Sequence, residues 1–271
     1  MLRSMKDLEQ YAIGATDGPI GHVKDFYFDD EAWVIRYLVV ETGSWLSSRK
    51  VLISPMSIRQ PDWAGRRLPV AITRAQVENS PDIDTDKPVS RQHELEYLGY
   101  YGYPYYWGGE GLWGEGMSPY ALLPLDPGVS RAVRRLDEAA AARAEREHLR
   151  NDDPHLRSCQ AVVGYHIHAS DGEIGHVSGL LVDEATWAIR YLVVNTSNWW
   201  LGHEVLIAPP WISGVHWSDR SVSVGLTRES VKNAPPYDST AELNRQREES
   251  LYAHYGRNGY WAGSVVLEPE L

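Results

Sequence analysis

The chain has 271 residues, of which 43% are hydrophobic and 11% aromatic, and its formal net charge is −11. This apolar content is enough to bury a core, so a wholly disordered or fibrous chain is excluded. The negative charge disfavours broad nucleic-acid binding, because phosphate backbones repel it. A single cysteine, Cys159, excludes an intramolecular disulfide and any zinc site built from cysteines.

Membrane and secretion signals are not expected either. No stretch approaches the roughly 18 consecutive apolar residues that a membrane span needs. Residues 1–10 alternate charged and apolar side chains and contain no apolar core of a signal peptide. Together with the lone cysteine, these features predict a cytoplasmic protein.

Short strands dominate the first part of the chain. Asp17-Gly18 lies between two runs of β-prone residues and predicts a hairpin turn. Residues 33–40 are mostly apolar at odd and at even positions alike, which predicts a strand buried on both faces. Thr73 is the expected N-cap of a short helical turn. The remaining expected elements are a strand at 21–28, a loop at 41–50, a strand at 51–54 and a hairpin at 63–72. So many short strands favour a small β-barrel.

The connector that follows has a different composition. Residues 91–98 predict a helix, which leads into an aromatic segment and then a glycine-rich stretch up to Gly116. Residues 129–150 are rich in Ala, Arg and Glu and predict an exposed helix. Near the end of the chain, residues 242–255 again have a helical pattern, followed by Tyr260 and Trp261.

The chain contains a tandem repeat at an offset of 154 residues. Without a gap, about 29 of the 65 positions in 17–81 are identical to their partners in 171–235. The match continues more loosely into the tails, where Trp107 aligns with Trp261. The simplest interpretation is two small domains of one fold. We therefore expect four regions: a first barrel at 1–83, an aromatic and helical connector at 84–158, a second barrel at 159–238 and a C-terminal helix with an aromatic tail at 239–271.

The repeated pattern resembles the PRC-barrel family. The resemblance is carried by Asp-Gly-x-Ile-Gly-His-Val at 17–23 and 171–177, an acidic turn at 29–30 and 183–184, Trp-x-Ile-Arg-Tyr-Leu-Val-Val at 33–40 and 187–194, and Thr-Arg-x-x-Val-x-Asn-x-Pro at 73–81 and 227–235. It implies a mainly β fold with two small PRC-type β-barrels in tandem. Known relatives include the cytoplasmic domain of the photosynthetic reaction-centre H subunit and the C-terminal domain of a ribosome-maturation factor. The family supplies no catalytic residues, and its known members mostly dock onto protein assemblies.

Two arginines in the repeated strands need partners. Arg36 and Arg190 each lie among apolar residues, and a buried guanidinium requires a compensating charge. The acidic turns place Asp29 and Asp183 within reach. We expect these pairs to support folding rather than to recognise an anion.

A histidine cluster in the second repeat is a candidate metal site. His166 and His168 alternate on an expected strand, so both rings point to one face, and His176 follows across a hairpin. The first repeat has Ala12 and Gly14 at the places of the first two histidines. A satisfied pair of surface histidines is the competing interpretation.

The aromatic arm between the repeats, Tyr97 to Trp107, is a candidate partner-binding segment. Tyrosine and tryptophan are the usual anchors of protein interfaces. The alternatives are packing of the arm across the chain's own barrels and stacking of bases or sugars. The candidate contact residues are Tyr101, Tyr103, Tyr105, Tyr106 and Trp107.

The sequence contains no arrangement that is typical of an enzyme. Residues 109–114 fit G-x-G-x-x-G, but a tyrosine-rich segment precedes them and Glu110 lies inside. We therefore expect a non-enzymatic adaptor without a cofactor, whose partner is another protein or a second copy of the chain, and association with a membrane complex stays open. The alternative function is metal or small-ligand binding by His166, His168 and His176.

Overall fold

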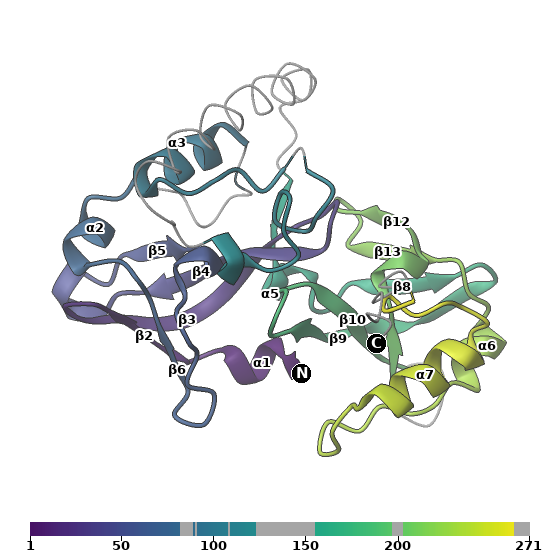
Figure 1. Ribbon diagram of the computed structural model, residues 1–271. Coiled ribbons are helices and arrows are strands. Elements are labelled where there is room, and N and C mark those ends of the chain that lie inside the picture. Colours follow the sequence, from purple (N-terminus) through teal and green to yellow (C-terminus); the bar gives the residue numbers. More distant parts are fainter. Residues whose placement is uncertain (82–88, 90, 108, 123–154, 197–202, 263–271) are drawn as a thin grey trace, which may run out of the picture. The chain divides into compact units, whose positions relative to one another are not determined.

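A computed structural model of the chain describes residues 1–81, 89, 91–107, 109–122, 155–196 and 203–262 (Figure 1). The fold is mainly β, with one sheet in the N-terminal part and a second in the C-terminal half, as the sequence predicts. The chain divides into two compact units. The N-terminal unit comprises Arg3–Val162 and Leu181–Arg190, and the C-terminal unit comprises Met1–Leu2, Val163–Leu180 and Tyr191–Leu271. No described helix is both long and apolar enough to cross a bilayer.

The N-terminal sheet has the strand order β5-β4-β3-β2-β6, with β7 pairing on β3. Its neighbours are antiparallel apart from β2 and β6, which run parallel. Strand β4 is buried along nearly its whole length, which confirms the strand expected at 33–40. The strands are β2 (Ala12–Ala15), β3 (Gly18–Asp29), β4 (Val34–Glu41), β5 (Lys50–Ile53), β6 (Arg67–Pro69) and β7 (Leu156–Ser158).

The C-terminal sheet repeats this order as β11-β10-β9-β8-β13-β12, with β1 pairing on β9. Here too the pair β8 and β13 is parallel, whereas β8–β9, β10–β11 and β12–β13 are antiparallel. The strands are β1 (Leu2–Ser4), β8 (His166–Ala169), β9 (Gly172–Asp183), β10 (Ile189–Asn195), β11 (Glu204–Ile207), β12 (Ile212–His216) and β13 (Ser221–Val224).

The repeated Asp-Gly-x-Ile-Gly motif has two structural tasks. Its aspartate turns the β2–β3 hairpin and also accepts a hydrogen bond from the start of a helix, at 2.8 Å between Asp17 Oδ1 and the Arg74 backbone nitrogen. Its second glycine lies against the neighbouring strand: a Cβ on Gly21 would be 1.9 Å from the Glu41 carbonyl oxygen. Only glycine allows this approach.

The described residues also form several helices. Thr73 caps α2 (Arg74–Glu78) in a capping box with Gln76, as predicted. The helix expected at 91–98 is α3 (Arg91–Tyr101), and the one expected at 242–255 is α7 (Arg245–His254). The helix expected at 129–150 lies outside the described residues. The other α-helices of the described residues are α1 (Met5–Leu8), α5 (Cys159–Val162) and α6 (Arg228–Lys232), and short 3-10 helices occur at Gly43–Leu46, Pro55–Ser57, Pro119–Leu122 and Pro209–Trp211.

Both strands that are off the main path, β1 and β7, have the sequence Leu-Arg-Ser at the repeat offset of 154. Strand β7 precedes the second repeat in sequence, yet it pairs with β3 of the first, with Phe28 opposite Arg157. Strand β1 precedes the first repeat and pairs with β9 of the second. The edge strand of each repeat is therefore exchanged with that of the other.

The hairpin 181–190 belongs to the second repeat in sequence but lies in the N-terminal unit. Trp33 and Trp187 take equivalent left-handed conformations, with φ of 54° and 59°. The carbonyl of Trp187 accepts from the Ile35 nitrogen at 2.8 Å, and that of Trp33 accepts from the Ile189 nitrogen at 2.7 Å. These reciprocal bonds offset the steric cost of about 1–2 kcal/mol that a bulky residue incurs in this conformation.

Candidate functional site

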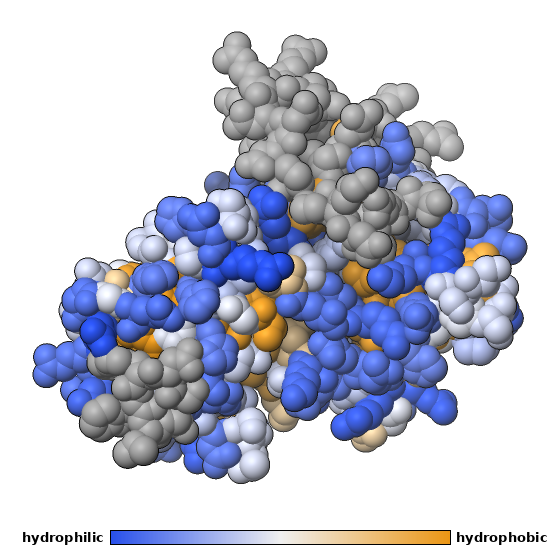
Figure 2. Space-filling model, turned by 180° about the vertical axis from the view of Figure 1, so that it is seen from behind, coloured by the Kyte–Doolittle hydropathy of each residue, from blue (hydrophilic) through white to orange (hydrophobic). Residues whose placement is uncertain are grey.

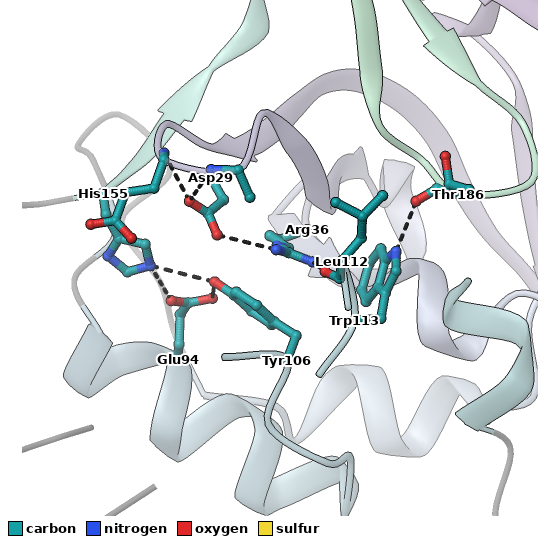
Figure 3. Close-up of polar contacts among 10 residues, drawn as sticks. Asp29, Arg36, Glu94, Tyr106, Leu112, Trp113, His155 and Thr186 are labelled. Carbon is teal, nitrogen blue, oxygen red and sulfur yellow. Dashed lines mark hydrogen bonds and ion pairs between the residues drawn. The ribbon is translucent and has the colours of Figure 1, made fainter. Parts of the chain in front are cut away.

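A buried ion pair marks the centre of the site in the N-terminal unit (Figure 3). The Arg36 guanidinium lies 3.2 Å from Asp29 Oδ2, and both side chains are almost fully buried. This pair and its equivalent, Arg190 with Asp183 at 3.2 Å, confirm the pairing expected from the sequence. Burial tends to raise the pKa of the Asp29 carboxyl, but the Arg36 charge and two backbone N–H donors hold it below its usual value.

The aromatic arm covers Arg36. The guanidinium carbon is 3.7 Å from the ring centre of Tyr106 and 4.8 Å from that of Trp113, which are cation–π distances. The Leu112 carbonyl accepts a hydrogen bond from Arg36 Nη1 at 2.5 Å. The aromatic arm and the segment after it are therefore attached to strand β4 through one side chain, Arg36, which makes the cation–π contacts and the hydrogen bond to the main chain.

Glu94 on α3 is the second buried carboxylate of the site (Figure 3). Its Oε2 lies 2.5 Å from His155 Nε2, and its Oε1 accepts from the Tyr106 hydroxyl at 2.6 Å. Burial and the negative charge of Glu94 raise the pKa of the Tyr37 hydroxyl well above its usual value. Because a buried carboxylate is costly without partners, this network holds α3 against the sheet.

The C-terminal unit contains an equivalent arrangement. Glu248, which is 154 residues after Glu94, accepts from the hydroxyls of Tyr191 at 2.7 Å and Tyr260 at 3.0 Å. Its cationic partner is Arg245 at 3.0 Å, on the same helix. The sequence shows both glutamates at the repeat offset, and this correspondence is the signal that could have identified them.

Three side chains from the segment that follows the aromatic arm bind the turn 183–187 through its main chain. Trp113 Nε1 donates to the Thr186 carbonyl and Ser118 Oγ to the Ala185 carbonyl, each at 2.8 Å, and the Tyr120 hydroxyl donates to the Glu184 carbonyl at 3.2 Å. We call Trp113, Ser118 and Tyr120 the clamp and residues 183–187 the second tip. All three acceptors are carbonyls of consecutive residues, so the clamp fixes the main chain of the second tip.

The predicted contact residues of the arm differ in exposure. Tyr106 is buried and is part of the Glu94 network. Tyr101 stacks on Tyr103 with ring centres 5.5 Å apart, and Tyr105 stacks on Trp107 at 4.9 Å. These four rings are half-buried and form the aromatic ridge: Tyr101, Tyr103, Tyr105 and Trp107.

The candidate metal residues lie on neighbouring strands of the C-terminal sheet. His166 is directly opposite His176 in the β8–β9 register, and His168 lies on the same face of β8 as His166. His166 Nδ1 is 2.8 Å from Glu173 Oε1. Among the described residues, no group of three or more His, Cys, Asp or Glu side chains is arranged to hold a metal ion. The metal hypothesis therefore gains no support from this geometry and stays a prediction.

Cys159 at the start of α5 is 3% exposed. Burial raises the pKa of its thiol well above the usual value, and the nearby Asp25 and Glu9 charges act in the same direction. We expect Cys159 to react with a thiol reagent at about pH 8 roughly 100-fold more slowly in the native than in the unfolded protein, because the thiolate is the nucleophile. Stopped-flow absorbance with an aromatic disulfide measures both rates.

A matched variant controls the reagent in this measurement. Cys159→Ser combined with Val163→Cys moves the thiol to an exposed neighbouring position. We expect this cysteine to react nearly as fast in the native as in the unfolded state. Equal native rates for the two proteins would contradict the burial of Cys159.

The visible surface of the protein is mostly hydrophilic. In Figure 2, hydrophilic residues cover most of the visible face, and hydrophobic surface appears between them. The polar groups of the site bond to one another and to carbonyls of the main chain.

Residues 7–73 match the model of the PRC-barrel domain family. This part of the chain is a PRC-barrel domain, as the resemblance implied. The family model does not assign the second, similar sheet. No curated protein matches the chain.

Proposed function

We propose that this PRC-barrel protein is a non-enzymatic adaptor that binds another protein through the aromatic ridge. One observation carries the proposal: the clamp, which is the continuation of the same arm, already binds three consecutive carbonyls of a polypeptide turn. Tyrosine and tryptophan provide large contact area together with hydrogen-bond donors at low entropic cost.

The ridge has the features of an interface anchor. Its rings are half-buried against their own unit, so they are held in place before a partner binds. Tyr97 lies on α3, the helix that ends at the ridge residue Tyr101, and it fixes this end of the ridge beside β5. Its hydroxyl donates to the Leu52 carbonyl at 2.9 Å and accepts from the Ser54 nitrogen at 3.2 Å. A prearranged ridge loses less conformational entropy on binding than a flexible one.

The experiment is affinity capture from the native host with the full-length protein and two matched variants. Trp107→Ala removes a ridge residue, and Trp261→Ala removes its equivalent in the second repeat. We expect Trp107→Ala, and more strongly Trp107→Ala with Tyr105→Ala, to lose the partners that the wild type retains. Trp261→Ala should keep them.

The readout is quantitative mass spectrometry of the captured proteins, with circular dichroism of each variant as a folding check. Sedimentation of the purified protein distinguishes a second copy of the chain from a different partner. Identical partner sets for the wild type and the Trp107→Ala variants would contradict the role of the ridge in binding.

A further inference from the structure

The two exchanged edge strands belong to equivalent strand–helix elements, since β1 continues into α1 and β7 into α5. Each strand carries an arginine that pairs with an acidic residue of the other repeat: Arg3 lies 2.7 Å from Glu184, and Arg157 lies 2.8 Å from Asp30. All four residues lie in the N-terminal unit. The β1–α1 element and the β7–α5 element are therefore docked by the same type of ion pair.

One carboxylate holds the β7–α5 element and has no counterpart for the β1–α1 element. Asp25 accepts hydrogen bonds from the Ser158 hydroxyl at 2.5 Å and from the Gln160 nitrogen at 3.1 Å. The residue 154 positions after Asp25 is Gly179, which has no side chain to accept a hydrogen bond. The Ser158 hydroxyl also accepts from a backbone nitrogen of α5 at 3.0 Å, whereas Ser4 forms no such side-chain cap on α1. The β1–α1 element therefore lacks the polar contacts that hold its equivalent at these positions.

The hinges that follow the two elements also differ. Gln10 follows α1 with a φ of 71°, and the equivalent Gly164 follows α5 with a φ of 91°. Each hinge is closed by a backbone hydrogen bond, from the Gln10 nitrogen to the Val23 carbonyl at 2.9 Å and from the Gly164 nitrogen to the Val177 carbonyl at 2.8 Å. The left-handed conformation is strained for glutamine but not for glycine. Extension of the first hinge therefore relieves a strain that the second hinge does not carry.

We propose that the β1–α1 element exchanges between two copies of the chain, so that β1 of each copy pairs with β9 of the other in a closed dimer. The partner is a second copy because the edge of β9 accepts a Leu-Arg-Ser strand that continues into a helix with Met5 and Leu8 buried. The exchanged dimer buries these two side chains again. Exchange needs no vacant site, since it uses the surface that β1 occupies in its own chain.

The docking contacts of β1 are the same in the monomer and in the exchanged dimer. The hinge therefore sets the dimerisation equilibrium, and the docking contacts set the rate at which the element opens. This self-association does not use the aromatic ridge, so it is independent of the proposed adaptor function. Failure of the ridge experiment leaves it standing, and the reverse also holds.

The test combines two full-length variants, Arg3→Glu and Glu184→Arg. Each variant alone places like charges at this contact, both in its monomer and in its own exchanged dimer. In an equimolar mixture, exchange of β1 restores an arginine–glutamate pair at both contacts. Sedimentation velocity should therefore show roughly tenfold tighter dimerisation in the mixture than in either variant alone. Circular dichroism of each variant checks that it is folded.

The matched control reverses the charges at the other exchanged strand. A mixture of Arg157→Asp and Asp30→Arg should show a much smaller gain, because Asp25 holds that element and its hinge is glycine. Equal gains in the two mixtures would overturn the selective exchange of β1. A first mixture that stays monomeric up to about 100 µM, or that dimerises no more tightly than its separate variants, would overturn the proposal as a whole.

Two further variants test the hinge and the missing carboxylate without opposing any charge pair. Gln10→Gly removes the hinge strain and should weaken dimerisation of the otherwise wild-type protein by roughly tenfold. Gly179→Asp supplies a carboxylate at a position where a Cβ would lie no closer than 3.9 Å to its neighbours. It should slow the approach to equilibrium and leave the final dimer fraction unchanged. Unchanged dimerisation in Gln10→Gly would contradict the role of the hinge and overturn the proposal.

Discussion

Arg36→Met should lower the free energy of unfolding of the N-terminal unit by about 3–5 kcal/mol, because it leaves the Asp29 carboxylate buried without its cation. Methionine keeps much of the apolar volume of the side chain, so the loss reports mainly on charge. The stacking on Tyr106 and the bond to Leu112 are lost at the same time. Denaturant unfolding followed by tryptophan fluorescence measures the change near pH 7.

The pH dependence gives this prediction a second readout. The folded-state pKa of Asp29 lies below its usual value, so its ionised form stabilises the wild type above the ordinary carboxyl pKa, and this stabilisation is lost as the pH falls. Without Arg36, burial favours the neutral acid. The difference between wild type and variant should therefore shrink as the pH is lowered through about 4.

The equivalent substitution in the second repeat is the control. Arg190→Met removes the same contact from Asp183, but at a more exposed position, so we expect a loss of only about 1 kcal/mol. Asp29→Asn in the Arg36→Met background should recover part of the stability, since it removes the uncompensated charge. Equal losses for the two arginines would show that burial of the Arg36 pair does not set its energy.

Trp113→Ala should cost about 3–5 kcal/mol of unfolding free energy, because a large side chain with 1% exposure is replaced by a cavity. The substitution also removes the bond to the Thr186 carbonyl and uncovers Arg36. Amide hydrogen exchange should increase in residues 183–190, since the second tip loses one of its three clamp donors. Denaturant unfolding and exchange mass spectrometry check the two parts.

A second substitution separates volume from hydrogen bonding. Trp113→Phe keeps a ring over Arg36 but lacks the indole N–H, so we expect a smaller loss of about 1–3 kcal/mol. Trp107→Ala removes a half-buried ring from the same arm and is the matched control for burial. Unchanged exchange at the second tip in Trp113→Ala would contradict the role of the clamp.

Local pairings could be predicted because their partners are close in sequence. Arg36 and Asp29 are seven residues apart on the two strands of one hairpin, so the turn at 30–33 brings them close together. The cap of α2 by Thr73 follows from residue types alone. The sequence does not predict the Leu-Arg-Ser strands, although it contains the identical triplets at an offset of 154, because three residues carry no periodicity.

The sequence by itself determined the class of this protein: a repeated, mainly β chain with PRC-barrel character, buried arginine–aspartate pairs and an aromatic arm. Hydrophobic periodicity and an ungapped repeat constrain these features residue by residue. Only the tertiary structure decided what the aromatic arm and the second tip contact. Trp113 donates to the Thr186 carbonyl, which is 73 residues further along the chain, and Glu94 contacts His155, which is 61 residues further along. Such pairs depend on the path of the chain through both repeats, and no local pattern encodes that path.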